Sequence, residues 1–430
     1  MLLVYTQKIT PRITYVFKHI CTRILGIEVT FTSVIEELIS FEGPKLSYGK
    51  QPLGNELFIQ SHGLLTQQGF ESEHIVVREW GDTKCFFSVT EKSNLPFDIF
   101  SAGFYLLSRY EEYLPHVKDA NGRFPAIESL GYNYGFLEQP VIDIWAYKFK
   151  SLLVKMFPEL VFPSRCFTIH TVVDASQPYA FKQRGFLRTV IGFTKDLLKF
   201  KLKRIIDRAA VLMGVRNDPF DTFQWLIQTA RKGSNKLTVF FMLGAPLVFE
   251  ESLNTRRQKF KLLVKYVADY KKVGLIFSHE TLSDYDMLKK EKKRIEDITN
   301  RALLESFNAH YLVNLPDTYR NLVELEIAKD YTMVYEDTPG FRAGTCTPFL
   351  FYDLDYEIKT PLIIHPITTT TAAFKNKYAS DIAKTIEKLW SSVNAVNGTF
   401  TMSFTNKNFT PIASNEVWRG LFSEKLHANE

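Results

Sequence analysis

The sequence has few of the residues that build disulfide frameworks and local metal sites. Its four cysteines are scattered among 430 residues and form neither a CxxC pair nor a zinc-ribbon spacing. Its nine histidines contain no HxH, HxxxH or HExxH pattern, so the usual local zinc motifs are excluded. Scattered cysteines are typical of reduced structural thiols, and we therefore expect a cytoplasmic protein.

Long apolar runs are also missing. No segment approaches the roughly 20 apolar residues that a transmembrane helix requires. Lys8 and Arg12 interrupt the apolar start of the chain, MLLVYTQKITPR, too soon for a signal peptide. These absences favour work in the cytoplasm, and they leave open a peripheral contact with a membrane or with a large polymer.

The charge balance is only mildly basic. The formal net charge is +6, and most of the excess lies in residues 184–208 and in the LKKEKKR run at 288–294. An excess of this size does not indicate a nucleic-acid partner. For residues 184–208, one interpretation is a solvated amphipathic helix, and the other is a helix that binds an anionic polymer or an anionic lipid surface.

Short strands and helices are mixed in the first part of the chain. We expect strands at 2–6 and 27–32, and helices at 11–25, 97–113 and 140–157. Two prolines in PELVFPSR, residues 158–165, break this pattern and indicate a domain boundary. We therefore divide the chain into a smaller α/β domain, residues 1–163, and a second domain, residues 164–430.

In the second domain, strand patterns alternate with helix patterns. Apolar runs predict strands at 167–173, 236–243, 273–277, 307–313, 330–336, 361–366 and 398–404. Such alternation predicts a mostly parallel sheet covered by helices, and the number of strands suits a (β/α) barrel. In a barrel of this kind, the chemistry lies at the carboxyl ends of the strands.

The predicted strand ends supply the candidate functional residues. Asp174 and Ser176 follow the first strand of the second domain, and His279 follows a later one. The residues that could bind a sugar ring are Tyr179, Phe181, Lys182, Phe349 and Tyr352. Aromatic rings suit the C–H faces of sugars, but packing in the core explains such a set equally often.

Eight segments of the sequence carry a resemblance to a known family. They are ITPRITYVF, PLGNELFIQSHGLL, LPFDIFSAGFYLLSRYEEYLPH, DASQPYAFKQRGFLRT, NDPFDTFQWL, NLPDTYRNL, DYTMVYEDTPGFRAGTCTPFLFYDL and GTFTMSFTN. With them, nearly the whole chain resembles the bacterial polysaccharide deacetylases of the NodB-homology type, which form carbohydrate esterase family 4. It resembles the two-domain form of Bacteroidota, in which a domain of unknown function precedes the deacetylase domain. The resemblance implies a distorted (β/α) barrel of the NodB type over residues 164–430.

The family resemblance implies metal-assisted hydrolysis of an acetamide. In the family, a divalent ion is held by one acid of an Asp-x-Asp pair and by histidine. The ion polarises the acetamide carbonyl and lowers the pKa of a bound water. A carboxylate serves as the general base, and a second histidine protonates the leaving amine.

Several positions of this constellation carry residues that lack the required chemistry. Asp174 matches the general base, but the metal-binding acid of the pair falls on Ser176. The metal-binding histidine falls on Ile276, and the general-acid histidine falls on Thr405. A neutral hydroxyl and an aliphatic side chain are poor partners for zinc, and one carboxylate does not supply the ligands that a dication requires. We therefore expect no bound metal and no other cofactor.

The roles of four residues stay open, with two interpretations for each. Asp174 either caps a strand end or lines a cavity inherited from the family. His310 matches the family and is either a core residue or a hydrogen-bond donor in a pocket. Arg342 also matches, and it either makes a structural ion pair or orients a carboxylate or ligand. His279 lies three residues past the expected ligand position, where it is either a relocated metal ligand or a surface histidine bonded within its loop.

Three functional hypotheses follow from these residues. The first is a polysaccharide-deacetylase-like pseudoenzyme that binds a polysaccharide, another glycan or an envelope-synthesis protein in surface-polysaccharide metabolism. The second is an active, divergent carbohydrate N- or O-deacetylase that holds a zinc-like metal in a rebuilt site of Asp174, His279 and His310. The third is a protein-interaction scaffold that acts through the N-terminal domain, residues 1–163.

Overall fold

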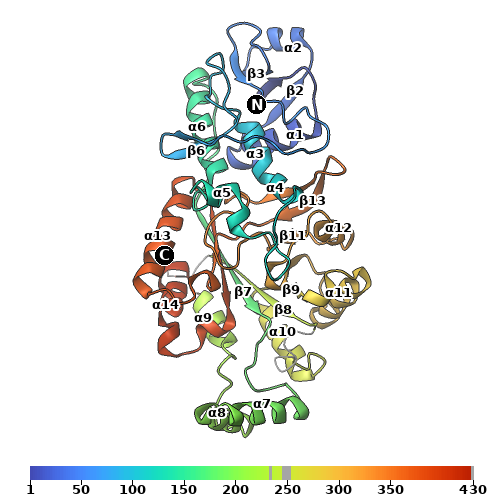
Figure 1. Ribbon diagram of the computed structural model, residues 1–430, viewed down its shortest axis with the longest axis vertical. Coiled ribbons are helices and arrows are strands. Elements are labelled where there is room, and N and C mark those ends of the chain that lie inside the picture. Colours follow the sequence, from blue (N-terminus) through green and yellow to red (C-terminus); the bar gives the residue numbers. More distant parts are fainter. Residues whose placement is uncertain (232–234, 245–252, 428–430) are drawn as a thin grey trace.

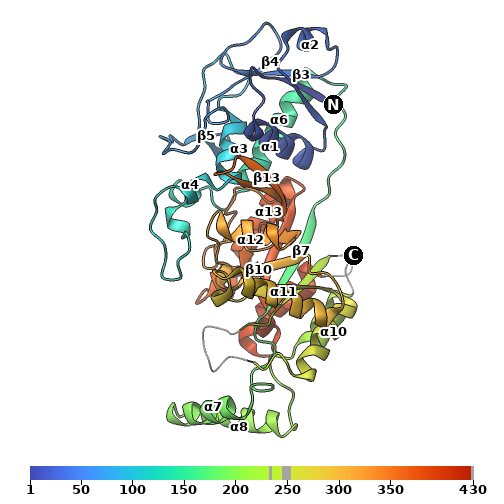
Figure 2. The same cartoon turned by 90° about the vertical axis from the view of Figure 1, so that its right-hand side faces the viewer.

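The computed structural model describes residues 1–231, 235–244 and 253–427. Two sheets follow one another along the long axis of the molecule (Figure 1). The N-terminal residues form a small sheet at one end, a nine-stranded sheet occupies the middle, and two helices project at the opposite end (Figures 1 and 2). All four cysteines are free thiols. None of the described helices has the length and hydropathy needed to cross a bilayer.

The small sheet has four parallel strands in the order β2-β1-β3-β4. Its strands are β1 (Leu2–Tyr5), β2 (Val29–Thr32), β3 (Lys45–Gly49) and β4 (Leu57–Gln60). Helix α1 (Pro11–Phe17) begins after a cap, because the Thr10 hydroxyl accepts a hydrogen bond from the Ile13 amide. It continues as a π-helix over Lys18–Ile24, so the helix predicted at 11–25 is confirmed.

Helices of the N-terminal region connect this sheet to the rest of the molecule. The other elements of the region are α2 (Ile35–Ser40), β5 (Arg78–Trp80), β6 (Thr83–Cys85), α3 (Ile99–Leu107), α4 (Tyr110–Tyr113), α5 (Leu130–Asn133) and α6 (Val141–Met156). Every residue of α3 is buried. The Asp98 carboxylate caps α3 by accepting hydrogen bonds from the amides of Phe100 and Ser101.

The nine-stranded sheet has the order β12-β13-β11-β10-β9-β8-β7-β15-β14, and among its described strands only β12 runs antiparallel to its neighbour. Its strands are β7 (Thr168–Ala175), β8 (Lys236–Met242), β9 (Lys272–Phe277), β10 (Glu305–Asn308), β11 (Lys329–Asp330), β12 (Phe349–Asp353), β13 (Ile358–Ile364), β14 (Thr369–Thr370) and β15 (Thr399–Thr405). The helices of this part are α7 (Phe186–Leu198), α8 (Leu202–Leu212), α9 (Phe223–Ala230), α10 (Gln258–Tyr270), α11 (Tyr285–Thr299), α12 (Asp317–Glu324), α13 (Ala379–Ala395) and α14 (Glu416–Gly420). The predicted mixture of helices with a mostly parallel sheet is therefore confirmed.

The predicted distorted (β/α) barrel is not confirmed. Among the described residues, the large sheet has two edge strands, β12 and β14, and no strand ladder joins them. The strand predicted at 330–336 is also shorter than expected and ends at Asp330. The carboxylate of Asp330 accepts hydrogen bonds from the amide and the hydroxyl of Thr332. Local side-chain bonds of this kind offer the backbone an alternative to the ladder.

Side chains alternate between the two faces of the large sheet. One face packs against helices in the main hydrophobic core. The other, called the inner face here, carries a separate buried cluster of Val172, Phe240, Met242, Ile276, Phe307, Ala309, Tyr311, Tyr331, Val334 and Ile367. Asp174 lies two residues after Val172 on β7, so its side chain belongs to the inner face.

Buried ion pairs join the N-terminal region to the large sheet. The Glu112 carboxylate accepts hydrogen bonds from Arg342 at 2.9 and 2.8 Å and from Arg109 at 2.8 Å. All three side chains are buried. Burial alone would raise the pKa of Glu112, but the two guanidinium charges outweigh it and lower the pKa to about 2. For Arg342, this is the structural ion pair that was one of its two interpretations.

A second polar contact ties α6 to the segment that follows Arg342. The Asp143 carboxylate accepts hydrogen bonds from the Cys346 amide at 3.0 Å and from the hydroxyls of Thr345 and Thr347. These residues belong to the GTCT part of DYTMVYEDTPGFRAGTCTPFLFYDL, one of the eight segments that carry the family resemblance. The polar residues of this segment therefore bond to the N-terminal region.

We expect Glu112→Gln to lower the free energy of unfolding by about 3–5 kcal/mol, because Arg342 stays buried without its counter-charge. Lys388→Ala, which removes an exposed ion pair with Glu138, is the matched control and costs less than about 1 kcal/mol. Urea denaturation measures both. The difference in the free energy of unfolding between the parent and Glu112→Gln shrinks as the pH falls from 4.5 toward about 2. Over this range Glu112 is protonated in the unfolded chain while it is still charged in the folded protein. Equal losses in both variants would contradict this account.

Candidate functional site

Asp174 stands at the carboxyl end of β7, with strands on both sides. The register pairs it with Thr405 of β15 on one side and with Phe240 of β8 on the other. Its Oδ1 accepts a hydrogen bond of 2.7 Å from the Ser176 amide, which closes a turn directly after the strand. Asp174 is therefore a partly exposed carboxylate flanked by the carboxyl ends of two parallel neighbours.

The three positions that lack the family's chemistry lie around this strand end. Ser176 offers one neutral hydroxyl. The Thr405 hydroxyl is hydrogen-bonded to Asn408 at 2.9 Å in the cap of a short 3₁₀ turn. Ile276 pairs in register with Met242 of β8, and it is fully buried in the inner-face cluster. Ile276 therefore serves packing and Thr405 serves capping, and none of the three side chains adds a charge beside Asp174.

His279 and His310 approach one another at the carboxyl edge of the sheet. Their ring centroids are 6.4 Å apart. His310 follows β10 with a left-handed φ of 57°, and this turn ends the strand predicted at 307–313 already at Asn308. His310 is exposed, so its interpretation as a core residue is wrong. His279 is half-buried at the start of a 3₁₀ turn after β9.

The surroundings of Asp174 disfavour its charge. Burial raises the pKa of Asp174 above its ordinary value. Hydrogen bonds from Ser176 and the charges of Lys407 and His310 act in the opposite direction without cancelling the rise. Ionisation of Asp174 therefore adds no stability to the folded protein.

A tyrosine and a serine beside Asp174 were missing from the sequence-based site. The hydroxyls of Tyr311 and Ser403 are hydrogen-bonded at 2.8 Å, and the Tyr311 ring stacks on Phe307. Burial and the nearby Asp174 charge raise the pKa of Tyr311. Ser403 lies two residues before Thr405 on β15, so alternation along that strand was the signal that would have found it.

The five residues predicted to bind a sugar do not form one group. Phe349 and Tyr352 lie on β12, which five strands separate from β7, and both are buried in the main core. Tyr179 and Phe181 follow β7 and are also buried. Lys182 is half-buried, and its amide donates a hydrogen bond of 3.0 Å to Asp218. The structure therefore does not bring the β12 pair to Asp174.

A loop of the N-terminal region reaches this edge of the sheet. Arg123 donates a hydrogen bond of 2.8 Å to the carbonyl of His310 and forms ion pairs with Asp119 and Glu336. Lys118 donates a hydrogen bond of 3.2 Å to the side chain of Asn314. The two predicted domains therefore meet beside the candidate site.

The side chains at this edge do not suit a divalent ion. Within residues 1–231, 235–244 and 253–427, no group of three or more His, Cys, Asp or Glu side chains is arranged to hold a metal. A site that activates water with zinc normally uses three protein ligands. Asp174, His279 and His310 come to the same edge of the sheet, but they do not form such a group.

Comparison with known proteins gives a family match for the N-terminal region only. Residues 2–158 match the model of a family of unknown function, DUF7033. None of the curated proteins matches the chain. The match coincides with the region that carries the small sheet and ends close to the predicted boundary at 163.

Solved structures similar to this chain include proteins described as deacetylases. A candidate polysaccharide deacetylase from Mycobacterium smegmatis is 11% identical, with a TM-score of 0.36 over 62% of this chain and 87% of its own. A CE4 family pseudoenzyme from Bacillus anthracis is 8% identical, with a TM-score of 0.30 over 61% and 62%. A mutant of that pseudoenzyme, described as having restored enzymatic activity, is 9% identical, with a TM-score of 0.31 over 60% and 64%.

We expect Asp174→Asn to raise the free energy of unfolding at neutral pH by on the order of 1 kcal/mol, because an amide keeps the bond from Ser176 and removes the cost of a charge at this partly buried position. The raised pKa means that the carboxyl stabilises the fold in its protonated form and that this contribution is lost as the pH rises. The gain should therefore disappear at acidic pH. Urea denaturation at both pH values measures it, with the exposed Asp297→Asn as control. If Asp174→Asn were less stable than the parent at neutral pH, the result would contradict a raised pKa of Asp174.

Proposed function

We propose that the protein is a polysaccharide-deacetylase-like pseudoenzyme that binds a glycan at the carboxyl edge of the large sheet. It works in the cytoplasm, in envelope or surface-polysaccharide metabolism. The observation that carries the proposal is the set of residues around Asp174. At the places where the resembled family has a second acid and two histidines, this chain has Ser176, Ile276 and Thr405.

Hydrolysis of an acetamide needs more than one carboxylate. Without a Lewis acid, a water molecule keeps its bulk pKa, and Asp174 as a general base has no activated nucleophile to generate. Enzymes typically lower a barrier by about 8 kcal/mol or more, which a single carboxylate does not supply. Ile276 is buried among apolar side chains, so no small rearrangement of this residue restores a donor.

The same edge suits the binding of sugar hydroxyls. The Asp174 carboxylate accepts charge-assisted hydrogen bonds, which are about twice as strong as neutral ones. The Ser176 hydroxyl both donates and accepts, and the exposed His310 supplies a further polar group. Polar groups that converge at a strand end can orient a ligand without transforming it.

An active deacetylase with a rebuilt site is the second candidate function. The observation in its favour is the distance of 6.4 Å between the ring centroids of His279 and His310, beside Asp174. Two imidazoles and one carboxylate would be a sufficient ligand set for zinc if their donor atoms converged at about 2.0–2.2 Å from one point. The two candidates therefore predict opposite results for metal binding.

We expect the purified parent protein to bind less than stoichiometric zinc, cobalt or nickel and to release no acetate from acetylated chito-oligosaccharides. Elemental analysis after dialysis and an acetate assay measure the two quantities. Stoichiometric metal together with acetate release would contradict the proposal. Loss of both in His279→Ala and His310→Ala would then assign the activity to the rebuilt site.

Adding donors to the site should create metal affinity. We expect Ser176→Asp with Thr405→His to bind zinc at least about tenfold more tightly than the parent, because a second carboxylate and an imidazole join Asp174. The triple variant that also carries Ile276→His should bind zinc more tightly still. Its unfolding curve shows whether the buried cluster tolerates the added histidine. Ser176→Ala with Thr405→Val is the matched control. Isothermal titration measures the affinities, and equal affinities in parent and variants would contradict the placement of these residues around one site.

Glycan binding is tested on the same edge. We expect the parent protein to bind acetylated chito-oligosaccharides in isothermal titration and Asp174→Asn to bind them about tenfold more weakly, since one charge-assisted hydrogen bond is lost. Asp297→Asn, on the exposed side of α11, should bind like the parent. Equal binding by the parent and Asp174→Asn would place the glycan elsewhere.

A further inference from the structure

The α7–α8 hairpin, residues 186–215, turns large apolar side chains outward. The exposed ones are Phe186, Leu187, Val190, Leu197, Leu198, Phe200, Leu202, Ile206, Leu212, Met213 and Val215. Phe186 and Phe200 are 86% and 87% exposed, and no other described phenylalanine has an exposed side chain. Apolar side chains gathered in this way on one projecting element mark a contact surface for something apolar.

Polar side chains, in contrast, occupy the inside of the hairpin. Arg208 of α8 donates two hydrogen bonds, of 3.2 and 2.6 Å, to the Asp196 carboxylate of α7, and both residues are buried. The Arg208 guanidinium also lies against Gly192, where a Cβ atom would come within 2.4 Å of it. The two helices are therefore joined by an ion pair, and the exposed apolar residues do not take part in this contact.

The segment that contains Arg184 and most of the hairpin also holds a large positive charge. Residues 184–208 contain eight lysines or arginines and two aspartates, a net charge of +6. This equals the net charge of the whole protein, because the remaining 45 basic residues are balanced by 45 acidic ones. A local excess of this size attracts anionic surfaces over a distance of about one Debye length.

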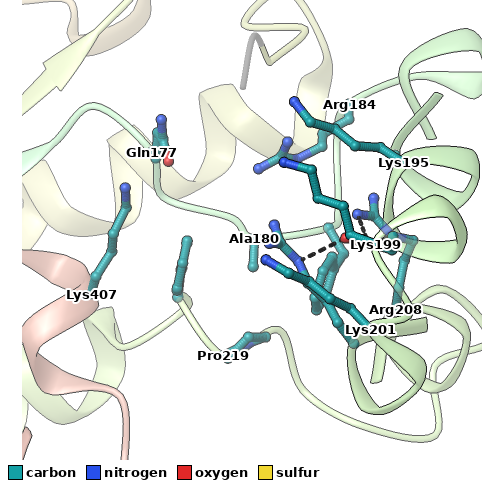
Figure 3. A pocket seen from close by; sticks show the side chains of 14 residues that line it. Gln177, Ala180, Arg184, Lys195, Lys199, Lys201, Arg208, Pro219 and Lys407 are labelled. Carbon is teal, nitrogen blue, oxygen red and sulfur yellow. Dashed lines mark hydrogen bonds and ion pairs between the residues drawn. The ribbon is translucent and has the colours of Figure 1, made fainter. Parts of the chain in front are cut away.

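Much of this charge lines one pocket at the base of the hairpin. The pocket has a volume of about 510 Å³. Its basic lining residues are Arg184, Lys195, Lys199, Lys201, Arg204, Arg208 and Lys407, and Asp196 is its one acidic residue among those that the structure describes. Figure 3 shows Lys407 facing the arginines and lysines of the hairpin from the opposite side of the pocket. A space of this kind suits a phosphate group.

We propose that the α7–α8 hairpin docks on a membrane that contains anionic phospholipids. Its exposed apolar side chains enter the acyl-chain boundary, and the basic pocket holds a lipid phosphate. Amphipathic helices with a basic polar face bind membrane interfaces through both contributions together. The inference does not depend on the pseudoenzyme proposal, because it uses no property of Asp174.

The placement of the two helices agrees with docking on a flat surface. In both views α7 and α8 lie across the end of the molecule, roughly perpendicular to its long axis (Figures 1 and 2). They occupy the end opposite the small N-terminal sheet. Both helices can therefore lie in the plane of a membrane while the body of the protein extends away from it.

Two other occupants explain only part of these observations. A soluble phosphate would fill the basic pocket and leave Phe186 and Phe200 in water. A second copy of the chain would cover the apolar side chains, but it would bring two segments of +6 together, and like charges in contact repel. An anionic membrane covers the apolar side chains and neutralises the charge in one contact.

Vesicle sedimentation of the full chain tests the proposal. We expect the parent to bind vesicles of phosphatidylcholine that contain a third of phosphatidylglycerol, and to bind pure phosphatidylcholine at least about tenfold more weakly. Phe186→Ser with Phe200→Ser should weaken binding to the anionic vesicles about tenfold or more, since two rings leave the membrane. Lys199→Gln with Lys201→Gln should weaken it by about tenfold.

Matched controls separate the hairpin from general effects. Val161→Ser with Tyr378→Ser removes side chains of equal exposure elsewhere, at 82% and 80%, and should bind like the parent. Lys289→Gln with Lys290→Gln removes two exposed charges from α11 and should also bind like the parent. Equal affinity for vesicles with and without phosphatidylglycerol would overturn the proposal. Hairpin variants that bind the anionic vesicles as tightly as the control variants would also overturn it. The proposal would also be overturned if the parent formed a dimer without affinity for vesicles and Phe186→Ser with Phe200→Ser dissociated that dimer. A second copy of the chain would then cover the hairpin.

Discussion

The alternation of side chains along the strands is the constraint on which the candidate site depends. Because successive residues point to opposite faces, Val172 and Asp174 of β7 share the inner face with Ile276 of β9. The apolar cluster of this face therefore extends to the edge at which the carboxylate stands. Ile276 is part of this packing, and the Asp174 carboxylate stands at the edge with the hydroxyl-bearing Ser176 and Thr405 as neighbours.

The candidate site lies between the N-terminal region and the α7–α8 hairpin, and different interactions connect each of them to it. On one side, buried ion pairs around Glu112 fix the N-terminal region to the large sheet, and Arg123 of that region donates to the carbonyl of His310. On the other side, Lys407 contributes both to the electrostatics of Asp174 and to the basic pocket of the hairpin. The domain of unknown function and the base of the projecting hairpin are therefore both next to the same strand ends.

Periodic and long-range features of the structure differ in how far the sequence predicts them. The helix expected at 140–157 is α6 at Val141–Met156, because a long amphipathic pattern suffices to define it. The neighbourhood of Asp174 and Thr405 came from the family resemblance. The early end of β11 was not predictable, because it depends on the Asp330 carboxylate bonding to Thr332. The burial of Tyr352 was not predictable either, because an aromatic residue suits a hydrophobic core and a sugar-binding site equally well.

The central claim is that too few ligands remain around Asp174 to hold a transition metal. Anomalous diffraction at the zinc edge, from crystals grown with excess zinc chloride, tests it most directly. The account predicts no anomalous peak within bonding distance of the Asp174 carboxylate. A strong peak bound by Asp174 together with His279 and His310 would contradict it and establish the rebuilt metal site.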